Sequence, residues 1–136
     1  MTVLGVIPVR WASTRLPGKP LADIGGKPML WWVWRAATRA RTLDRVIVAT
    51  DDRRILDAAR GFGAEAVMTP RTCRSGSDRV AEVARRVKSD LVVNIQGDEP
   101  FLKPAAIDRA VRPLLKARRW RMGTLAAPLE SAERPN

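Results

Sequence analysis

The sequence has little of what secreted and membrane proteins are built from. It holds a single cysteine, Cys73, which cannot form a disulfide within the chain and agrees with a reducing compartment. No apolar run approaches the ~20 residues that a membrane-spanning helix needs. The amino-terminal stretch lacks the charged start and small-residue cleavage site of a signal peptide. These absences predict a cytoplasmic protein that has no membrane partner.

Acidic residues are also scarce. The 136 residues carry 14 acidic and 25 basic side chains, which gives a formal net charge of +11, and twenty of the basic residues are arginines. Such a charge attracts polyanions, so nucleic acid, nucleotide and acidic sugar all qualify as partners. Alternatively, the arginines reflect a GC-rich coding sequence and lie mostly on solvated faces.

The amino-terminal stretch joins an apolar segment to a basic loop. Val3–Val9 is continuous in its apolar residues, as expected of a strand that is covered on both faces of a parallel sheet. The loop that follows carries three cations, Arg10, Arg15 and Lys19, together with Ser13 as a neutral donor. Guanidinium and ammonium groups bind phosphate oxygens, so we expect this loop to hold the phosphates of a nucleotide.

This loop is not a P-loop. No glycine lies five places before Gly18, and Pro20 stands where a P-loop has serine or threonine. A Walker-type ATPase is therefore excluded, and a solvated basic loop remains the alternative to a phosphate site.

Apolar segments of strand length alternate with helical patterns along the chain. This alternation predicts one α/β domain over residues 1–136, with a Rossmann-like, mostly parallel sheet and helices on both faces. Ligands of such sheets bind beyond the carboxyl ends of the strands. Asp51 is expected to cap the second helix, and Pro113 is expected to kink or end the last. The predicted strands are 3–9, 45–50, 65–68, 91–95 and 122–127, and the predicted helices are 28–40, 52–60, 76–87 and one from 104 onward.

Two later segments could carry chemistry. Asp98 follows the predicted strand 91–95, where a carboxylate could hold Mg²⁺ beside substrate phosphates, or could simply belong to an acidic turn. In the segment SGSDR, Gly76 permits close approach of a ligand, and Ser75 and Arg79 offer donors to ribose or base edges. Capping of the following helix explains a serine and Asp78 equally well.

Four blocks, in this order and at these separations, resemble the 3-deoxy-manno-octulosonate (Kdo) cytidylyltransferases. The resemblance covers nearly all of the 136 residues but only the amino-terminal part of that family's longer chain. The four blocks are PVRWASTRLPGKPL at 8–21, IVATDD at 47–52, RSGSDRVAEV at 74–83 and VNIQGDEP at 93–100.

The resemblance implies a fold of the nucleotide-diphospho-sugar transferase type and a reaction in which CTP and Kdo give CMP-Kdo and pyrophosphate for lipopolysaccharide biosynthesis. It implies Mg²⁺ as the cofactor and a homodimer for the full-length family. By the same similarity, Arg10, Lys19 and Asp98 are the catalytic residues, Arg15 also holds the triphosphate, and Asp98 ligates the metal. Ser13, Ser75, Gly76, Arg79 and Gln96 would complete the substrate site.

One departure and two alternatives accompany the resemblance. Cys73 stands where the family usually shows a histidine, and the family's carboxyl-terminal part, which supplies a further metal carboxylate and the dimer contact, is absent. The chain could therefore bind CTP without turning it over. It could instead bind nucleic acid through an acid-free basic run around Trp120, although no recognised motif supports this. The run comprises Arg109, Arg112, Lys116, Arg118, Arg119 and Arg121.

Overall fold

A computed structural model describes residues 1–12, 17–117 and 122–124 of the chain. Within these residues the structure contains one five-stranded sheet, a small two-stranded sheet, four α-helices and one 3-10 helix. In chain order the elements are β1 (Val3–Val9), η1 (Lys19–Leu21), β2 (Asp23–Ile24), β3 (Lys27–Pro28), α1 (Met29–Arg39), β4 (Arg45–Thr50), α2 (Arg53–Gly61), β5 (Glu65–Met68), α3 (Gly76–Arg86), β6 (Leu91–Asn94), α4 (Pro104–Ala117) and β7 (Met122–Thr124).

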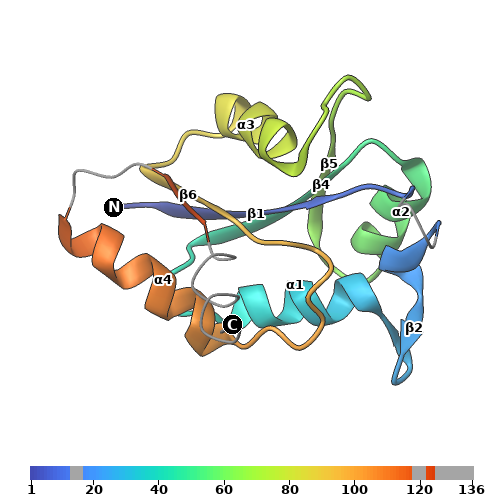
Figure 1. Cartoon of the computed structure of the whole chain (residues 1–136), viewed down its shortest axis with the longest axis horizontal. Helices are drawn as coiled ribbons and strands as arrows, with labels where there is room; N and C mark the ends of the chain where they lie inside the picture. The colour runs from blue at the N-terminus through green and yellow to red at the C-terminus, as the bar shows by residue number, and fades with distance from the viewer. Residues whose placement is uncertain (13–16, 118–121, 125–136) are drawn as a thin grey trace, which may run out of the picture.

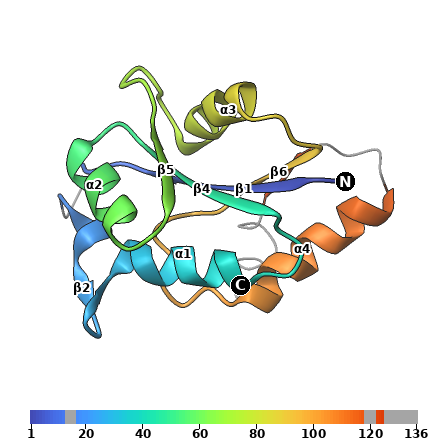
Figure 2. The same ribbon diagram turned by 180° about the vertical axis from the view of Figure 1, so that it is seen from behind.

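The larger sheet lies between helices on both of its faces. Its strands run parallel in the order β5-β4-β1-β6-β7. Helix α3 lies on one side of the sheet, and α1 and α4 lie on the other (Figure 1), an arrangement that the reverse view also shows (Figure 2). The predicted α/β fold with a parallel sheet and helices on both faces is therefore confirmed.

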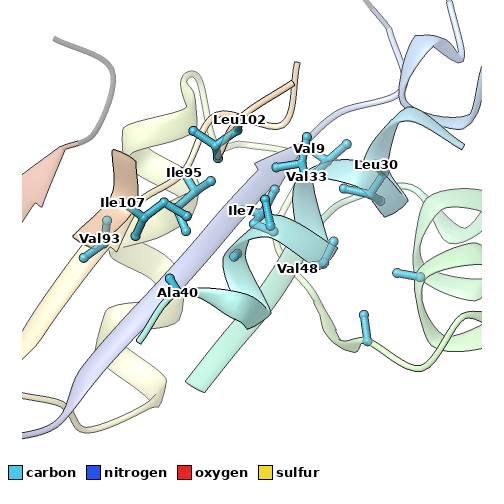
Figure 3. Close-up of a cluster of buried hydrophobic side chains, with 14 of the residues drawn as sticks. Ile7, Val9, Leu30, Val33, Ala40, Val48, Val93, Ile95, Leu102 and Ile107 are labelled. Atoms are coloured by element: carbon cyan, nitrogen blue, oxygen red, sulfur yellow. The ribbon is translucent and has the colours of Figure 1, made fainter. Parts of the chain in front are cut away.

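Two apolar cores explain why β1 is apolar throughout. Alternate side chains of a strand point to opposite faces of a sheet. Ile7 and Val9 pack with Leu30 and Val33 of α1 in the larger core, which also takes in residues of α2 and α4 (Figure 3). Leu4 and its neighbours on the other face pack against α3 in the smaller core. Both sets are buried, so the continuous apolar run is the pattern of a strand with no solvent-facing side.

Strand β1 is also the point from which the sheet grows in two directions. It pairs with β4 along one edge and with β6 along the other. An open α/β sheet binds ligands at such a switch point, in the crevice beyond the carboxyl ends of the strands. The loops that follow β1 and β6 are therefore where this fold is expected to bind a ligand.

The expectation that Asp51 caps the second helix is wrong, because the cap is Asp52. Asp52 Oδ1 accepts the amide hydrogen of Arg54 at 2.8 Å, and α2 begins at Arg53. Strand β4 continues to Thr50, which leaves Asp51 in the bend between strand and cap. Asp51 is thereby free to pair elsewhere.

Pro113 does not end its helix, since α4 continues to Ala117. Proline removes one amide hydrogen from a helix and leaves the carbonyl four residues earlier without its usual partner. Arg109, which supplies that carbonyl, and Pro113 are both exposed, so water can satisfy it.

The fold also includes two short strands after η1 and a last strand, β7. Gly25 and Gly26, both at positive φ, form a turn that joins the short strands β2 and β3, which sequence patterns did not predict. Strand β7 covers the first half of the predicted strand 122–127, whose remainder lies outside the described residues. Among the described helices, none combines the length and hydropathy that crossing a bilayer requires.

Candidate functional site

A cleft of about 450 Å³ opens beyond the carboxyl ends of β1 and β6. It is formed by the end of β1 and the loop after it, by η1, by the start of α3 and by the loop after β6. Its lining residues include four cations and one carboxylate among the residues that the structure describes, so the cleft is electropositive. The charged and polar lining residues are Arg10, Lys19, Cys73, Arg74, Ser75, Arg79, Gln96 and Asp98.

Arg10 and Lys19 enter the cleft from the two ends of the loop after β1. Both side chains are exposed, and neither lies in an ion pair with a carboxylate of the described residues. Their charges are thus available to an anion. Ser13 and Arg15, predicted for the same loop, lie outside the described residues.

Backbone geometry places Lys19 at the start of η1. Gly18 precedes it with φ +77°, a left-handed conformation that glycine adopts without strain. The carbonyl of Gly18 accepts the amide hydrogen of Leu21 at 2.9 Å, and that of Lys19 accepts the amide hydrogen of Ala22 at 3.0 Å. The position of Lys19 therefore follows from the turn and not from side-chain contacts.

Asp98 reaches the cleft because the β1–β6 pairing continues past the end of β6. The amide of Ile95 donates to the carbonyl of Val6 at 2.9 Å. A Cβ atom at Gly97 would lie 3.3 Å from Val9 Cγ2 and 3.4 Å from the carbonyl oxygen of Pro8, so only glycine fits there without displacement. This close approach of two backbones brings the exposed carboxylate of Asp98 into the same cleft as Arg10.

The carboxylate of Asp98 suits a metal that is shared with a substrate. The described residues contain no group of three or more cysteine or acidic side chains that could hold a metal by themselves. Mg²⁺ is commonly held by one or two carboxylates together with substrate phosphates and water. One exposed carboxylate in the same cleft as Arg10 and Lys19 fits that mode and does not fit a metal cage built by protein ligands alone.

The amino terminus of α3 forms a wall of the cleft. Ser75 is the N-cap, and its Oγ accepts the amide hydrogen of Asp78 at 3.1 Å, as the capping alternative expected. The ring of Pro8 lies 3.3 Å from where a Cβ of Gly76 would be, so the helix start packs against the end of β1. Free amide hydrogens at a helix start, with the positive end of its dipole, favour an anion. Capping and ligand binding by this segment are therefore compatible.

Arg79 lies deeper than the sequence suggested, since it is only 4% exposed. Its Nη1 donates to Thr69 Oγ1 at 2.5 Å, and its Nη2 lies 3.6 Å from Asp51 Oδ2. These contacts join the segments after β4 and β5 to α3 beneath the cleft. Arg79 thus lines the site while its guanidinium is held mainly by protein groups.

Gln96 and Arg74 also line the cleft. Gln96 is exposed, and its amide donates to Asn94 Oδ1 at 3.1 Å, which orients it at the rim. Arg74 is a fourth cation that sequence reasoning did not single out. Its position directly before a serine N-cap was the available signal, because the residue before a helix start lies near the amide groups that attract anions.

The predicted nucleic-acid-binding run is only partly described. Arg109, Arg112 and Lys116 are exposed on α4, whereas the remaining members of the run and Trp120 lie outside the described residues. None of the three lines the cleft. Nucleic-acid binding by this run stays a prediction.

Comparisons with known proteins identify relatives of this chain in sequence and in fold. The family model described as Cytidylyltransferase matches residues 4–136. The 3-deoxy-manno-octulosonate cytidylyltransferase of Geobacter sulfurreducens is 50% identical over 131 residues, which are 96% of this chain and 52% of the relative. The enzyme of the same name from Pseudomonas fluorescens is 52% identical over 131 residues, or 94% of this chain and 51% of the relative. The chain thus spans about half the length of the curated relatives it matches.

A solved structure is similar over the same part. The CMP:2-keto-3-deoxy-manno-octonic acid synthetase complexed with CTP superposes with a TM-score of 0.86 at 40% identity. The match covers 88% of this chain and 49% of that chain. A cytidylyltransferase from Leptospira borgpetersenii, 22% identical with a TM-score of 0.74 over 85% of this chain and 50% of its own, shares the fold.

Proposed function

The chain belongs to the cytidylyltransferase family, and from this premise we propose that it forms the nucleotide-binding half of an enzyme that activates Kdo with CTP. One observation carries the proposal: Arg10 and Lys19 from the loop after β1 and Asp98 from the loop after β6 line one cleft. A triphosphate with a divalent cation is the ligand whose charges complement this set. The names of the relatives point to CTP as the nucleotide and Kdo as the acceptor.

The proposed reaction is an in-line displacement at phosphorus. The anomeric oxygen of Kdo forms a bond to the α-phosphorus of CTP, the bond to the bridging oxygen breaks, and pyrophosphate leaves. The proton of the attacking hydroxyl passes to solvent. No covalent intermediate on the protein is required, so catalysis consists of positioning and charge stabilisation.

Each residue that was predicted for the site has a proposed role in that reaction. Arg10 and Lys19 bind triphosphate oxygens and stabilise the charge that develops on the leaving pyrophosphate. Asp98 would hold Mg²⁺, which when bound neutralises phosphate charge and favours attack. The amide groups at Ser75 and Gly76, with Gln96, would contact the nucleoside or sugar, and Arg79 supports this wall from below. Ser13 and Arg15 would add contacts from the same loop as Lys19.

The half-length match favours a second candidate, in which this chain binds CTP but does not turn it over. Thermal unfolding with and without CTP and Mg²⁺, followed by pyrophosphate release on adding Kdo, separates the two. Stabilisation by CTP that exceeds stabilisation by ATP, with pyrophosphate release, supports the enzyme. Stabilisation without release supports the binding fragment, and no stabilisation by any nucleotide contradicts both.

The setting of the reaction is part of the proposal. We place it in the cytoplasm, where nucleoside triphosphates are available and the single cysteine would stay reduced. The product would serve lipopolysaccharide biosynthesis, and the full-length enzyme would act as a homodimer.

A further inference from the structure

The loop that carries Arg10 and Lys19 is closed at its base by Trp11 and Gly18. The amide of Gly18 donates to the carbonyl of Trp11 at 2.8 Å. A Cβ atom at Gly18 would lie 2.8 Å from Cζ2 and 2.9 Å from Cη2 of the Trp11 ring, so the indole packs directly on the backbone at Gly18. Trp11 follows one cation in the chain and Gly18 precedes the other. The contact between them therefore adjoins both charged residues in the chain.

Arg54 of α2 packs on the same Trp11 ring. The Cζ atom of Arg54 lies over the Trp11 ring, 3.5 Å from its centroid, which is a close cation–π geometry. Arg54 is in turn bound by Asp52, through Nε to Oδ1 at 3.0 Å and Nη2 to Oδ2 at 2.7 Å. Two parallel hydrogen bonds of this kind fix a guanidinium in orientation as well as in place.

Asp52 links the arrangement to the sheet. Its amide donates to Thr50 Oγ1 at 3.2 Å, and Thr50 is the buried last residue of β4. The side-chain hydrogen bonds from Arg54 hold the pKa of Asp52 below its ordinary value, so the pair stays charged at neutral pH. A continuous series of contacts thus runs from the end of β4 through Asp52 and Arg54 to Trp11.

We propose that Trp11 and Arg54 are positioning residues that fix the two ends of the loop after β1, so that Arg10 and Lys19 face the cleft in a binding arrangement. We call the contact between them the Trp11–Arg54 clamp. It acts through the backbone at residues 11 and 18 and touches no substrate. The expected effect of the clamp on nucleotide affinity rests on the proposed function. Its expected effect on the conformation of the loop does not.

The neighbouring residue Arg53 supplies a matched control. Arg53 is 71% exposed and pairs with Asp57 one turn along α2, whereas Arg54 is 60% exposed and contacts the indole. Arg53→Gln and Arg54→Gln remove the same charge from adjacent positions. Any difference between them therefore reports the contacts of Arg54 with Trp11 and Asp52, and not the general attraction of a basic protein for an anion. Both side chains are exposed enough for the variants to fold.

The first measurement is amide hydrogen exchange at Gly18 in the protein without ligand. Loss of an exposed cation–π contact corresponds to about a two- to fivefold change in an equilibrium. We expect Arg54→Gln to raise the exchange rate at Gly18 by that factor, while Arg53→Gln leaves it unchanged and amides of β6 keep their wild-type rates in both. Equal rates at Gly18 in the two variants would overturn the clamp.

The second measurement is CTP affinity by titration calorimetry. Arg54→Gln should weaken CTP binding about two- to fivefold relative to Arg53→Gln. Faster exchange with an unchanged affinity, in a wild-type protein that binds CTP, would overturn the positioning role. If the wild type binds no CTP, the proposed function fails, and the exchange comparison alone decides whether the clamp exists.

Discussion

Replacing Lys19 with alanine removes one of the two cations that flank the loop after β1, and it should weaken CTP binding without unfolding the protein. Lys19 is exposed and makes no described ion pair, so its loss leaves no buried charge behind. Two unit charges about 4 Å apart attract by about 1 kcal/mol in water and about 4 kcal/mol near a protein surface. The exposure of Lys19 places it in the lower half of that range, at about 1–2 kcal/mol, which is roughly a 5- to 30-fold loss of affinity.

The assay is titration of CTP at two salt concentrations, with Lys88→Ala as the control. Lys88 is also exposed, but it lies shortly before the start of β6, at the amino-terminal end of the strands and therefore at the opposite end from the cleft. Both variants lose one charge, so a long-range effect of net charge would weaken binding equally. We expect Lys88→Ala to change the affinity by less than about twofold and the difference between the variants to shrink at high salt. Equal affinities for the two variants would refute the assignment of Lys19 to the phosphate site.

Three further changes test other parts of the structure. Asp98→Asn should abolish the Mg²⁺ dependence of CTP binding. The affinity without metal should stay the same or improve, because a carboxylate that repels phosphate is removed. If CTP binding still depends on Mg²⁺, the metal is held elsewhere. Gly18→Ala should lower the free energy of unfolding by about 1–2 kcal/mol in urea titrations, since the left-handed conformation and the Trp11 ring both oppose a Cβ atom. Asp108 is buried and accepts hydrogen bonds from the amide and hydroxyl of Thr42 at 2.8 and 2.6 Å, so Asp108→Asn should cost about 1–3 kcal/mol of stability. Burial opposes ionisation of Asp108, but the hydrogen bonds from Thr42 outweigh it and lower its pKa from the ordinary 3.8. Its stabilising contribution is therefore complete above pH 3.8 and is lost as the pH falls through the lower folded value, so the stability gap between wild type and Asp108→Asn should narrow below about pH 4.

Much of the sheet could be predicted because its signal is local. Val3–Val9 and Arg45–Thr50 are apolar enough to be read as strands, and both have the predicted bounds. General rules for α/β folds then predict a parallel sheet and locate its ligands at the carboxyl ends of the strands. For this reason Arg10, Lys19 and Asp98 could be assigned to one place from the sequence alone, and the structure brings them into one cleft.

The features that could not be predicted depend on contacts between residues that no sequence pattern indicates. Asp51 and Asp52 are chemically identical neighbours, and only the backbone conformation after β4 decides which of them caps α2. The depth of Arg79 depends on Thr69, ten residues away, and on Asp51, which belongs to another loop. Stacking of Arg54 on Trp11 joins residues 43 apart, for which neither hydrophobic period nor turn chemistry offers a signal.

The pairing of β1 with β6 affects how this protein tolerates substitutions. The loops that carry Arg10 and Asp98 follow adjacent strands, and substitutions on the outer surfaces of the helices leave the backbone hydrogen bonds between those strands untouched. Mutations on those surfaces can therefore raise or lower the melting temperature without altering the spacing of the charged groups. The thermal stability of the protein and the spacing of its charged groups can therefore change independently during evolution.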